Sequence, residues 1–500
     1  MSNGYGISKW EDAKTIYNEL HELTSKPIYC VSEEALKDVL DYFETKCAKS
    51  KAITTEAKQY IPGGVQHNLA FNYPFPICVT KAEGAFLYDL DGNKYYDFLQ
   101  AGGPTILGSN YAPVREKVIE LLNDCGPVTG LFHEGELLLA KEINKHMPNV
   151  EMFRMLGSGT ESVMAAIRVA RCATKAKRIK VGGAYHGWAD QMGYGLKIPG
   201  SRFFLESHGI PHSCYGTTDE VRPNDLDMLE KMLKLNKMRG GTAAVIVEPV
   251  GPESGTRPVD FNYNKEVRKL CDKYGCLFIF DEVVTGFRVG LGGAQGYFDV
   301  VPDLTIFGKI VAGGYPSAGG VGGKKEFVSG MAAGVGTMMK RAYVGGTLAA
   351  NPLSSYAGYC AIQEIARTNA CEVAGRAGDR LAAGLKDLVN KYGLPYVVYN
   401  QGSIVHLECT GAMSYDFSSM NILKSALPML KTKPEMLRRK SAMEEMGAAY
   451  MANGIVTLAG SRLYTSMADT DEIIDGALER FDDVFKNVKV CPADRVFAKK

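Results

Sequence analysis

Between residues 110 and 355, short apolar runs alternate with stretches of helical periodicity. The apolar runs are rich in valine, isoleucine and phenylalanine and include "FRML" at 153–156, "AAVIVEPV" at 243–250, "CLFIFDEVV" at 276–284 and "DLTIFGK" at 303–309. They do not alternate with polar residues, which indicates strands buried on both faces. Helical stretches such as "TESVMAAIRVARCATK" lie between them. The pattern predicts an α/β fold, a mainly parallel central sheet covered by helices.

The two ends of the chain follow other patterns. Ser32 precedes an apolar stripe made of Leu36, Val39, Leu40 and Phe43, so we expect it to cap a helix. Residues 84–100 form two alternating runs around Asp91-Gly92-Asn93, which predicts a β-hairpin. Helical patterns dominate again from about residue 355.

Composition argues against several classes of protein. The chain carries 57 Lys plus Arg against 56 Asp plus Glu, a net charge of +1, so no global field attracts nucleic acid or an anionic membrane. No apolar run approaches the ~20 residues of a membrane span, and the first residues lack the apolar core of a signal peptide. The sequence therefore predicts a cytoplasmic protein.

Cysteine and histidine residues give no metal or disulfide pattern. Twelve cysteines are scattered from Cys30 to Cys491 with no CxxC pair, so we expect reduced thiols. His208 and His212 are four residues apart, but Pro211 lies between them and disfavours a shared helical face. No metal site is predicted.

Residues 156–162, "LGSGTES", open a predicted helix. Ser158 and Glu161 fit a capping box, which would be enough to explain them. Gly157 and Gly159 also bare the main chain where unpaired N–H groups and the helix dipole favour an anion. A cap and a phosphate site are both compatible with this motif alone.

Three further strand ends carry distinctive side chains. Tyr185, in "GGAYHGWAD", either roofs the core or stacks on a flat ring. Asp281 ends a strongly apolar strand, where it could cap a helix, pair with Arg288 or serve a ligand. Lys309 ends the next strand, and a buried ammonium must find a partner, lose its proton or become covalently engaged.

Read together, the four loops match the requirements of pyridoxal 5'-phosphate. The carboxyl ends of parallel strands meet at one edge of a sheet, so the loops are expected to gather there. The glycine loop would hold the phosphate and Tyr185 would stack on the ring. Asp281 would keep the pyridine nitrogen protonated, and Lys309 would form the Schiff base. This chemistry accounts for the lone lysine, since an imine is not a free ammonium.

The same motifs resemble those of class III aminotransferases of fold type I, most closely the glutamate-1-semialdehyde aminomutase-like branch. The likeness runs from "YIPGGV" at 60–65 to "TDEIIDGALERF" at 470–481. It is dense in "GSGTESVMAAIRVAR", "YHGWAD", "LFIFDEVVTGFRVGLGGAQGYF", "PDLTIFGKIVAGGYP" and "GGTLAANPL". The resemblance implies a large cofactor-binding domain at 110–355. It also implies a smaller α+β domain from the two chain ends, with a helical extension and small-domain segment at 1–109 and a C-terminal part at 356–500.

The resemblance also implies a role for individual residues. Lys309 and Asp281 are the implied catalytic residues, as Schiff-base lysine and pyridinium partner. The implied cofactor-binding set contacts the phosphate, the ring faces or the ring hydroxyl: Ser158, Gly159, Thr160, Tyr185, Asn224, Asp281, Val283, Lys309 and Thr347. In this set Val283 packs on the ring face opposite Tyr185. Thr347 reaches a phosphate across a dimer interface, which implies a homodimer.

The segments that would receive substrate differ from the aminomutase pattern. Where that pattern reads roughly Asn-Ser-Pro-Val-Arg, residues 66–70 read Gln-His-Asn-Leu-Ala, and a Ser-Trp-Gly is replaced by Ala-Gly-Gly at 101–103. Loss of a carboxylate-binding arginine removes charge-assisted hydrogen bonds worth roughly 1.5–3 kcal/mol each. We therefore do not expect glutamate-1-semialdehyde as substrate. Four residues either line the altered pocket or serve ordinary packing: His67, Phe71, Phe132 and His133.

Three functions remain open on the sequence. The leading hypothesis is an aminotransferase that moves an amino group between an amine or amino acid donor and a keto acid acceptor. An aminomutase or racemase would use the same cofactor and the same first half-reaction. A nucleotide- or nicotinamide-dependent protein is the third, although the chain lacks both a G-x-G-x-x-G at the first strand unit and a GK[ST].

Overall fold

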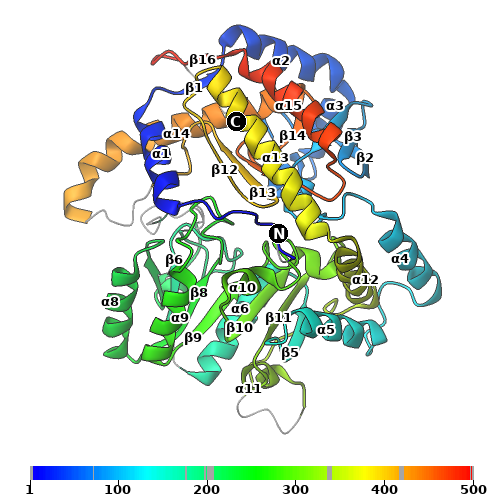
Figure 1. Ribbon diagram of the computed structural model, residues 1–500, viewed down its shortest axis with the longest axis vertical. Coiled ribbons are helices and arrows are strands. Elements are labelled where there is room, and N and C mark those ends of the chain that lie inside the picture. Colours follow the sequence, from blue (N-terminus) through cyan, green and yellow to red (C-terminus); the bar gives the residue numbers. More distant parts are fainter. Residues whose placement is uncertain are drawn as a thin grey trace. The chain divides into compact units, whose positions relative to one another are not determined.

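The computed structural model describes residues 4–70, 72–174, 177–195, 199, 208–334, 341–415, 422–495 and 497. The chain folds into two compact units (Figure 1). Unit 1 comprises Met1–Tyr5, Ala112–Glu372 and Asp416–Met420. Unit 2 comprises Gly6–Tyr111, Val373–Tyr415 and Asn421–Lys500.

Unit 1 is built on a mainly parallel sheet, which confirms the predicted α/β fold. Among the described residues the sheet has seven strands in the order β5-β11-β10-β9-β8-β6-β7. Their bounds are β5 (Met152–Leu156), β6 (Lys177–Val181), β7 (Thr218–Val221), β8 (Thr242–Val247), β9 (Leu277–Asp281), β10 (Leu304–Gly308) and β11 (Gly319–Gly323). Neighbours from β10 to β7 pair in parallel, whereas β11 runs antiparallel to both β10 and β5.

Strand β11 reads "GGVGG", and the sequence does not predict it, because glycine is a weak strand former. Its glycines are required by close neighbours. A Cβ on Gly319 would overlap the backbone of Ser158, and a Cβ on Gly320 would overlap the Phe153 ring. The central sheet accepts this strand only without side chains at these positions.

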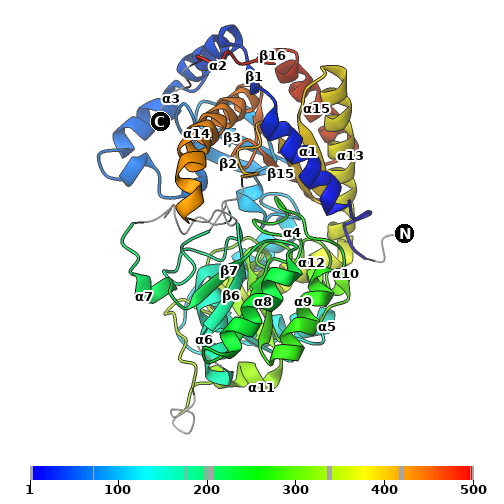
Figure 2. The same ribbon diagram turned by 90° about the vertical axis from the view of Figure 1, so that its left-hand side faces the viewer.

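Helices cover the sheet of unit 1 (Figures 1 and 2). Their bounds are α4 (Ala112–Asp124), α5 (Glu134–His146), α6 (Gly159–Ala173), α7 (His212–Tyr215), α8 (Leu226–Lys237), α9 (Tyr263–Tyr274), α10 (Gly293–Phe298), α11 (Lys325–Val328) and α12 (Pro352–Thr368), with short 3-10 turns at Lys309–Ala312 and Ser329–Met331. The buried stripe of α6 joins one core cluster with Ile246, Ile279 and Ile306. Every residue of β8, β9 and β10 is buried, so both faces of these strands are covered.

Unit 2 combines smaller sheets with long helices. Its sheets are β14-β4-β3-β2, β12-β13-β15 and β1-β16. The strands are β1 (Tyr29–Val31), β2 (Val79–Glu83), β3 (Phe86–Asp89), β4 (Lys94–Asp97), β12 (Val397–Gln401), β13 (Ile404–Glu408), β14 (Ile455–Val456), β15 (Arg462–Tyr464) and β16 (Val488–Val490). The helices are α1 (Ala13–Ser25), α2 (Glu33–Lys46), α3 (Ala48–Ala57), α13 (Ala370–Lys391), α14 (Ile422–Ala452) and α15 (Asp471–Phe485), with 3-10 turns at Pro62–Gly64, Asn68–Ala70 and Gln100–Gly102.

Two local predictions in unit 2 are confirmed. The Ser32 side chain accepts a hydrogen bond from the Ala35 N–H (3.2 Å) at the start of α2. Strands β3 and β4 form the antiparallel hairpin predicted around Asp91-Gly92-Asn93. No helix in the described part of the chain combines the length and apolar character needed to cross a bilayer.

The expectation of reduced thiols is wrong for one pair of cysteines. Cys30 and Cys491 form a disulfide between residues 461 positions apart. They lie at strands β1 and β16, which pair antiparallel and bring the two chain ends together within unit 2. The spacing of the cysteines does not predict this pair. The other ten cysteines are free thiols.

Candidate active site

Asp281 and Lys309 lie at the same edge of the unit 1 sheet. Strands β9 and β10 are parallel neighbours, with Asp281 opposite Ile306. Lys309 follows the last residue of β10 and begins a 3-10 turn. Its backbone has a φ of 50°, in the left-handed region that non-glycine residues seldom adopt. Such strain persists only where the surroundings impose it, and it concentrates at functional sites.

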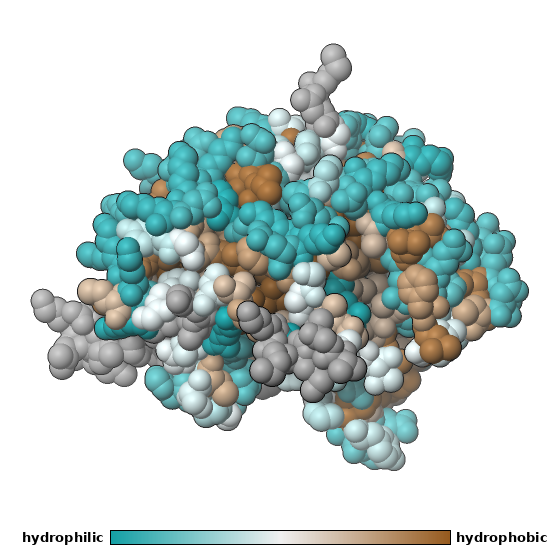
Figure 3. Space-filling model, turned by 90° about the horizontal axis from the view of Figure 1, so that it is seen from below, coloured by the Kyte–Doolittle hydropathy of each residue, from teal (hydrophilic) through white to brown (hydrophobic). Residues whose placement is uncertain are grey.

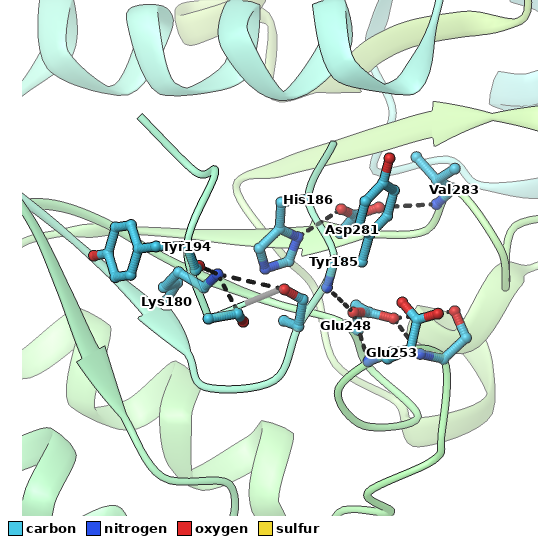
Figure 4. A network of polar contacts seen from close by, with 11 residues as sticks. Lys180, Tyr185, His186, Tyr194, Glu248, Glu253, Asp281 and Val283 are labelled. Carbon is cyan, nitrogen blue, oxygen red and sulfur yellow. Dashed lines mark hydrogen bonds and ion pairs between the residues drawn. The ribbon is translucent and has the colours of Figure 1, made fainter. Parts of the chain in front are cut away.

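The Asp281 carboxylate has two partners from its own unit. Its Oδ2 lies 2.7 Å from His186 Nδ1, and its Oδ1 accepts a hydrogen bond from the Val283 N–H at 3.1 Å (Figure 4). His186 is fully buried, and burial lowers its pKa although Asp281 opposes this. The imidazole is therefore neutral at neutral pH, and its Nδ1–H donates to the carboxylate. A carboxylate has about four lone-pair sites, so Asp281 can accept further donors.

Glu248 fixes the loop that carries Tyr185. It follows strand β8, and its Oε1 accepts hydrogen bonds from the N–H groups of Tyr185 and Glu253, each at 2.8 Å. Its Oε2 accepts from the backbone N–H of Ser254 and, at 3.0 Å, from the Ser254 hydroxyl. Burial and the nearby Glu253 and Asp281 raise the pKa of Glu248 to about 8. Figure 4 shows this cluster next to the Asp281–His186 pair.

Lys180 holds the same loop from strand β6. Its side chain is fully buried, and its Nζ donates to the carbonyls of Tyr194 (2.7 Å), Gly195 (3.2 Å) and Ala184 (3.3 Å). The main chain at both ends of the loop from Ala184 to Tyr194 therefore accepts hydrogen bonds from the buried Lys180 amine. These hydrogen bonds place Tyr185 and His186 at the sheet edge.

The motif at 156–162 forms the cap that the sequence allows. Ser158 Oγ accepts from the Glu161 N–H at 3.2 Å. The Glu161 carboxylate accepts a hydrogen bond from the Gly157 N–H at 2.7 Å. In a regular capping box it would accept from the next residue, the N-cap itself. Helix α6 has 15 residues, so the dipole at its first turn favours an anion.

Glycines bring this loop against the strand ends. A Cβ on Gly159 would lie 3.1 Å from Val283 Cγ2, and one on Gly308 would lie 2.8 Å from Val283 Cγ1. Val283 therefore packs between the first residue of α6 and the residue before Lys309. A Cβ on Gly187 would lie 2.8 Å from the Cα of Thr160, so the loop after His186 also reaches α6.

The other expected residues lie in varied surroundings. Asn224 binds main chain: its Nδ2 donates to the Pro258 carbonyl (3.1 Å) and its Oδ1 accepts from the Asp260 N–H (2.9 Å). Thr347 is exposed in unit 1. His133 is the N-cap of α5, where its side chain accepts from the Gly135 N–H at 3.1 Å.

The contacts of the remaining pocket residues proposed from the sequence do not indicate a part in binding or catalysis. Phe132 is 75% exposed in unit 1. His67 lies in unit 2, and its Nδ1 accepts from the Leu69 N–H at 3.1 Å. Phe71 lies outside the described residues.

Sequence reasoning missed three polar residues around Asp281. His186 stands inside "YHGWAD" and Glu248 inside "AAVIVEPV", both of which were recognised as motifs. The available signal was their position: Glu248 directly follows a β-rich run, much as Asp281 ends one, and His186 lies in the loop after "RIKV". Lys180 stands two residues after Arg178 in "RIKV", so nothing in the sequence marks it as the buried cation of this strand.

Comparison with known proteins decides the family. Residues 69–484 match the family described as aminotransferase class-III. The chain belongs to this family. This class III aminotransferase is 38% identical over 445 residues to a glutamate-1-semialdehyde 2,1-aminomutase of Acetivibrio thermocellus, covering 87% of this chain and 96% of that relative. A second relative of the same name, from Sulfurisphaera tokodaii, is 39% identical over 355 residues, covering 70% of this chain and 81% of the relative.

Solved structures share the fold of this aminotransferase. An omega-transaminase from Sphaerobacter thermophilus superposes with a TM-score of 0.76 at 25% identity, covering 89% of this chain and 99% of that one. A glutamate-1-semialdehyde aminomutase from Pseudomonas aeruginosa gives 0.75 at 20% identity, covering 94% and 98%. The fold is that of the fold type I transferases, as predicted, and the enzyme is pyridoxal-phosphate-dependent.

The residues at the strand ends fit this cofactor. The first turn of α6 offers backbone N–H groups to a phosphate. Asp281 has lone pairs left for a protonated ring nitrogen, because His186 and the Val283 N–H each donate one hydrogen bond to its carboxylate. Lys309 supplies an amine at the neighbouring strand end. Gly159 and Gly308 let Val283 pack closely against the first residue of α6 and the residue before Lys309.

Proposed function

We propose that the protein is an aminotransferase that moves an amino group between an amine or amino acid and a keto acid, with Lys309 and Asp281 as its catalytic residues. The observation that carries the proposal is the placement of Lys309 beside a strand whose last residue, Asp281, is held by a buried neutral histidine. Pyridoxal phosphate, when bound, supplies an aldehyde that accepts amines and a cationic ring that draws electrons from the substrate carbon.

Lys309 acts twice in this reaction. With pyridoxal phosphate bound, its Nζ would hold the cofactor covalently. Once released, the same amine would serve as the base that moves the proton at the substrate carbon, and a positioned base of this kind contributes about 10²–10⁴-fold. Lysine suits both tasks because its amine is nucleophilic once deprotonated.

Asp281 maintains the charge on the ring. Its carboxylate would accept the N–H of the ring nitrogen, and the Nδ1–H of His186 orients that carboxylate. A fixed anion at this point would stabilise positive charge on the ring with no reorganisation of solvent.

The proposed binding residues surround these two. Tyr185 and Val283 would pack on the two ring faces. The phosphate would be held by the main chain of Ser158, Gly159 and Thr160 and by the hydroxyls of Ser158 and Thr160. Asn224 completes the set near the ring hydroxyl, since its NH₂ group carries a second N–H besides the one that binds Pro258.

We also propose a homodimer in which Thr347 reaches the phosphate of the second copy. Apolar side chains on unit 1 support this surface: Leu131 (81% exposed), Phe132 (75%), Tyr343 (65%) and Leu348 (52%). Exposed apolar side chains that adjoin, as Leu131 and Phe132 do in the sequence, are typical of association surfaces. The 127–132 segment adjoins the start of α12, where the Leu353 N–H binds the Pro127 carbonyl at 3.4 Å. Figure 3 shows brown apolar patches between teal areas on one face.

Sedimentation of the wild type and of Phe132→Asp tests the dimer. The dimer is expected to dissociate in the variant, and Thr347→Ala is expected to bind cofactor more weakly without dissociating. A monomeric wild type would contradict the proposal.

An aminomutase is the second candidate, and the relatives at 38% and 39% identity favour it. The substrate segments argue against glutamate-1-semialdehyde itself, because residues 66–70 and 101–103 lack the arginine and tryptophan of that branch. Both segments belong to unit 2.

The discriminating experiment screens amino donors against pyruvate and 2-oxoglutarate while the visible spectrum of the cofactor is followed. Bleaching that requires a donor and recovers with a keto acid supports the aminotransferase. Turnover of a single amino aldehyde without any acceptor supports the mutase. A protein that stays colourless with pyridoxal phosphate, or that borohydride does not label at Lys309, contradicts both.

We propose further that the enzyme works in the cytoplasm, on the grounds of its near-zero net charge and its ten free cysteines. The Cys30–Cys491 disulfide is typical of oxidising compartments and weighs on the other side. Cell fractionation decides between them, and recovery outside the cytoplasm would refute the proposal.

A further inference from the structure

Tyr5 occupies a slot in unit 1 that glycines keep open. It pairs with Gly290 in an isolated antiparallel bridge. A Cβ on Gly290 would lie 2.7 Å from Tyr5 Cε1, one on Gly292 would lie 2.8 Å from the Tyr5 hydroxyl, and one on Gly296 would overlap that hydroxyl. The ring also meets Tyr297 edge to face at 5.8 Å. The Tyr5 side chain therefore packs against three positions at which only glycine leaves room for it.

The segment that receives Tyr5 also binds Glu282. The fully buried Glu282 carboxylate accepts from the N–H groups of Ala294 (2.7 Å) and Gln295 (3.1 Å). It also accepts from the Gln295 side-chain amide (3.0 Å) and the Thr285 hydroxyl (2.9 Å). A Cβ on Gly293 would lie 2.6 Å from this carboxylate. Residues 290–296 therefore contact Tyr5 and Glu282 together.

Glu282 is the residue after Asp281. Its backbone N–H donates to the Ile306 carbonyl at 3.0 Å, which continues the β9–β10 pairing one step past the strand. Its side chain then anchors that strand end to α10. The direction of the Asp281 side chain depends on this anchor, because the two residues share a peptide bond.

We propose that Tyr5 is a positioning residue for Asp281, acting through residues 290–296 and Glu282. This inference rests on the proposed role of Asp281 toward the cofactor. Tyr5 lies outside residues 69–484, the part of the chain that matches the family. The N-terminal extension thus adds a support for the active-site strand that the matched region does not contain.

The charges that face Tyr5 agree with this arrangement. Burial raises the pKa of the Tyr5 hydroxyl, and the Glu282 carboxylate raises it further. The hydroxyl therefore stays protonated at neutral pH.

The test compares Tyr5→Ala, Tyr5→Phe and a matched control, Tyr88→Ala, which removes another half-buried tyrosine on β3 of unit 2. Apoprotein is titrated with pyridoxal phosphate, and amide hydrogen exchange of the apoprotein is followed at 281–296. Tyr5→Ala is expected to weaken cofactor binding about 2- to 30-fold, the range for residues coupled to a ligand they do not touch. It should also speed exchange at Asp281 and Glu282. Tyr5→Phe and Tyr88→Ala should stay within about twofold.

Gly292→Ala gives a second route that keeps Tyr5. The φ of Gly292 is −77°, so alanine is tolerated by the backbone and only the contact with the Tyr5 hydroxyl is strained. Gly292→Ala is expected to weaken cofactor binding in the wild type and to lose that effect in the Tyr5→Phe background. Equal effects in both backgrounds would overturn the coupling.

Two outcomes separate this inference from the proposed function. If Asp281→Asn weakens cofactor binding while Tyr5→Ala leaves affinity and exchange at Asp281 unchanged, Tyr5 only anchors the N-terminus and the inference is wrong. If Asp281→Asn itself leaves affinity and spectrum unchanged, the role of Asp281 fails instead.

Discussion

The Nδ1 atom of His186 lies 2.7 Å from Oδ2 of Asp281, and both side chains are buried. A buried carboxylate is costly unless donors satisfy it, and here one donor comes from a histidine that burial keeps neutral. The pair fixes the direction of the Asp281 carboxylate, which is what a partner for a cationic ring requires.

Replacement of His186 tests that pair. His186→Ala removes a hydrogen bond to a charged group, worth about 1.5–3 kcal/mol, so cofactor affinity is expected to fall about 10- to 100-fold. His186→Asn places an amide near the position of Nδ1 and should recover most of the loss. The measurement is a cofactor titration of the apoproteins, followed by absorbance. Equal losses in both variants would mean that the imidazole serves packing alone.

Lys309→Ala is expected to abolish turnover and leave the fold intact, because its side chain is half-buried and not part of the packed core. Activity and thermal unfolding of the variant provide the check. Substantial residual turnover at native-like stability would show that another amine does the chemistry.

Gly308→Ala tests the space beside Lys309. The φ of Gly308 is −162°, which any residue adopts, so the only obstacle to alanine is Val283 Cγ1 at 2.8 Å. Overpacking of this kind costs about 1–3 kcal/mol. The shift of Val283 is expected to lower cofactor affinity. Gly330→Ala is the matched control, because a Cβ there meets no atom within 4 Å. Similar cofactor affinities for the two variants would contradict the packing described.

The sequence could predict the large unit well, since buried parallel strands leave an unmistakable apolar signature. It placed Asp281 and Lys309 at neighbouring strand ends by the same logic. Strand β11 could not be predicted, because its glycines are required by contacts with residues that are distant in the sequence. The roles of His186 and Glu248 could not be predicted, because only the fold brings them to their partners, Asp281 and the Tyr185 main chain.

Strands β1 and β16 of unit 2 and the Cys30–Cys491 bond could not be predicted for a related reason. Strand β1 finds its partner β16 more than four hundred residues away, and each is three residues long. Three residues are too few for an alternation of apolar and polar side chains that would predict a strand. Pairings between the ends of a long chain depend on the whole topology.

Stability should fall as the pH drops below the ordinary histidine pKa of about 6.5. Burial lowers the pKa of His186 and, together with Arg462, lowers that of His406 well below its usual value. The unfolded chain then binds protons that the folded chain does not, so each group removes up to about 1.4 kcal/mol per pH unit. Glu248 changes stability in the opposite direction between about pH 4.5 and 8, because its pKa is raised and the folded chain binds the proton more tightly.

The variant His406→Gln isolates the contribution of His406 to this pH dependence. Its denaturation midpoint should depend less on pH between 6.5 and 5.5 than that of the wild type, and parallel pH profiles would contradict the assignment.

The disulfide between Cys30 and Cys491 should stabilise unit 2 by restricting its unfolded state. Cross-links of this kind contribute about 2–4 kcal/mol, although a long loop does not guarantee the upper value. We expect the Cys30→Ser, Cys491→Ser double variant to unfold at lower denaturant than the wild type, and a reducing agent to lower the wild-type midpoint to the same value. Cys172→Ser removes an exposed free thiol and serves as the control. A buried guanidinium, Arg495, lies 3.1 Å from Cys30 Sγ and pairs with Glu445 at 2.6 Å, so the double variant leaves a charged pair in place and changes only the sulfur contacts. A double variant as stable as the wild type, or a wild type indifferent to reductant, would show that strand pairing and the Arg495–Glu445 pair hold the chain ends without the bond.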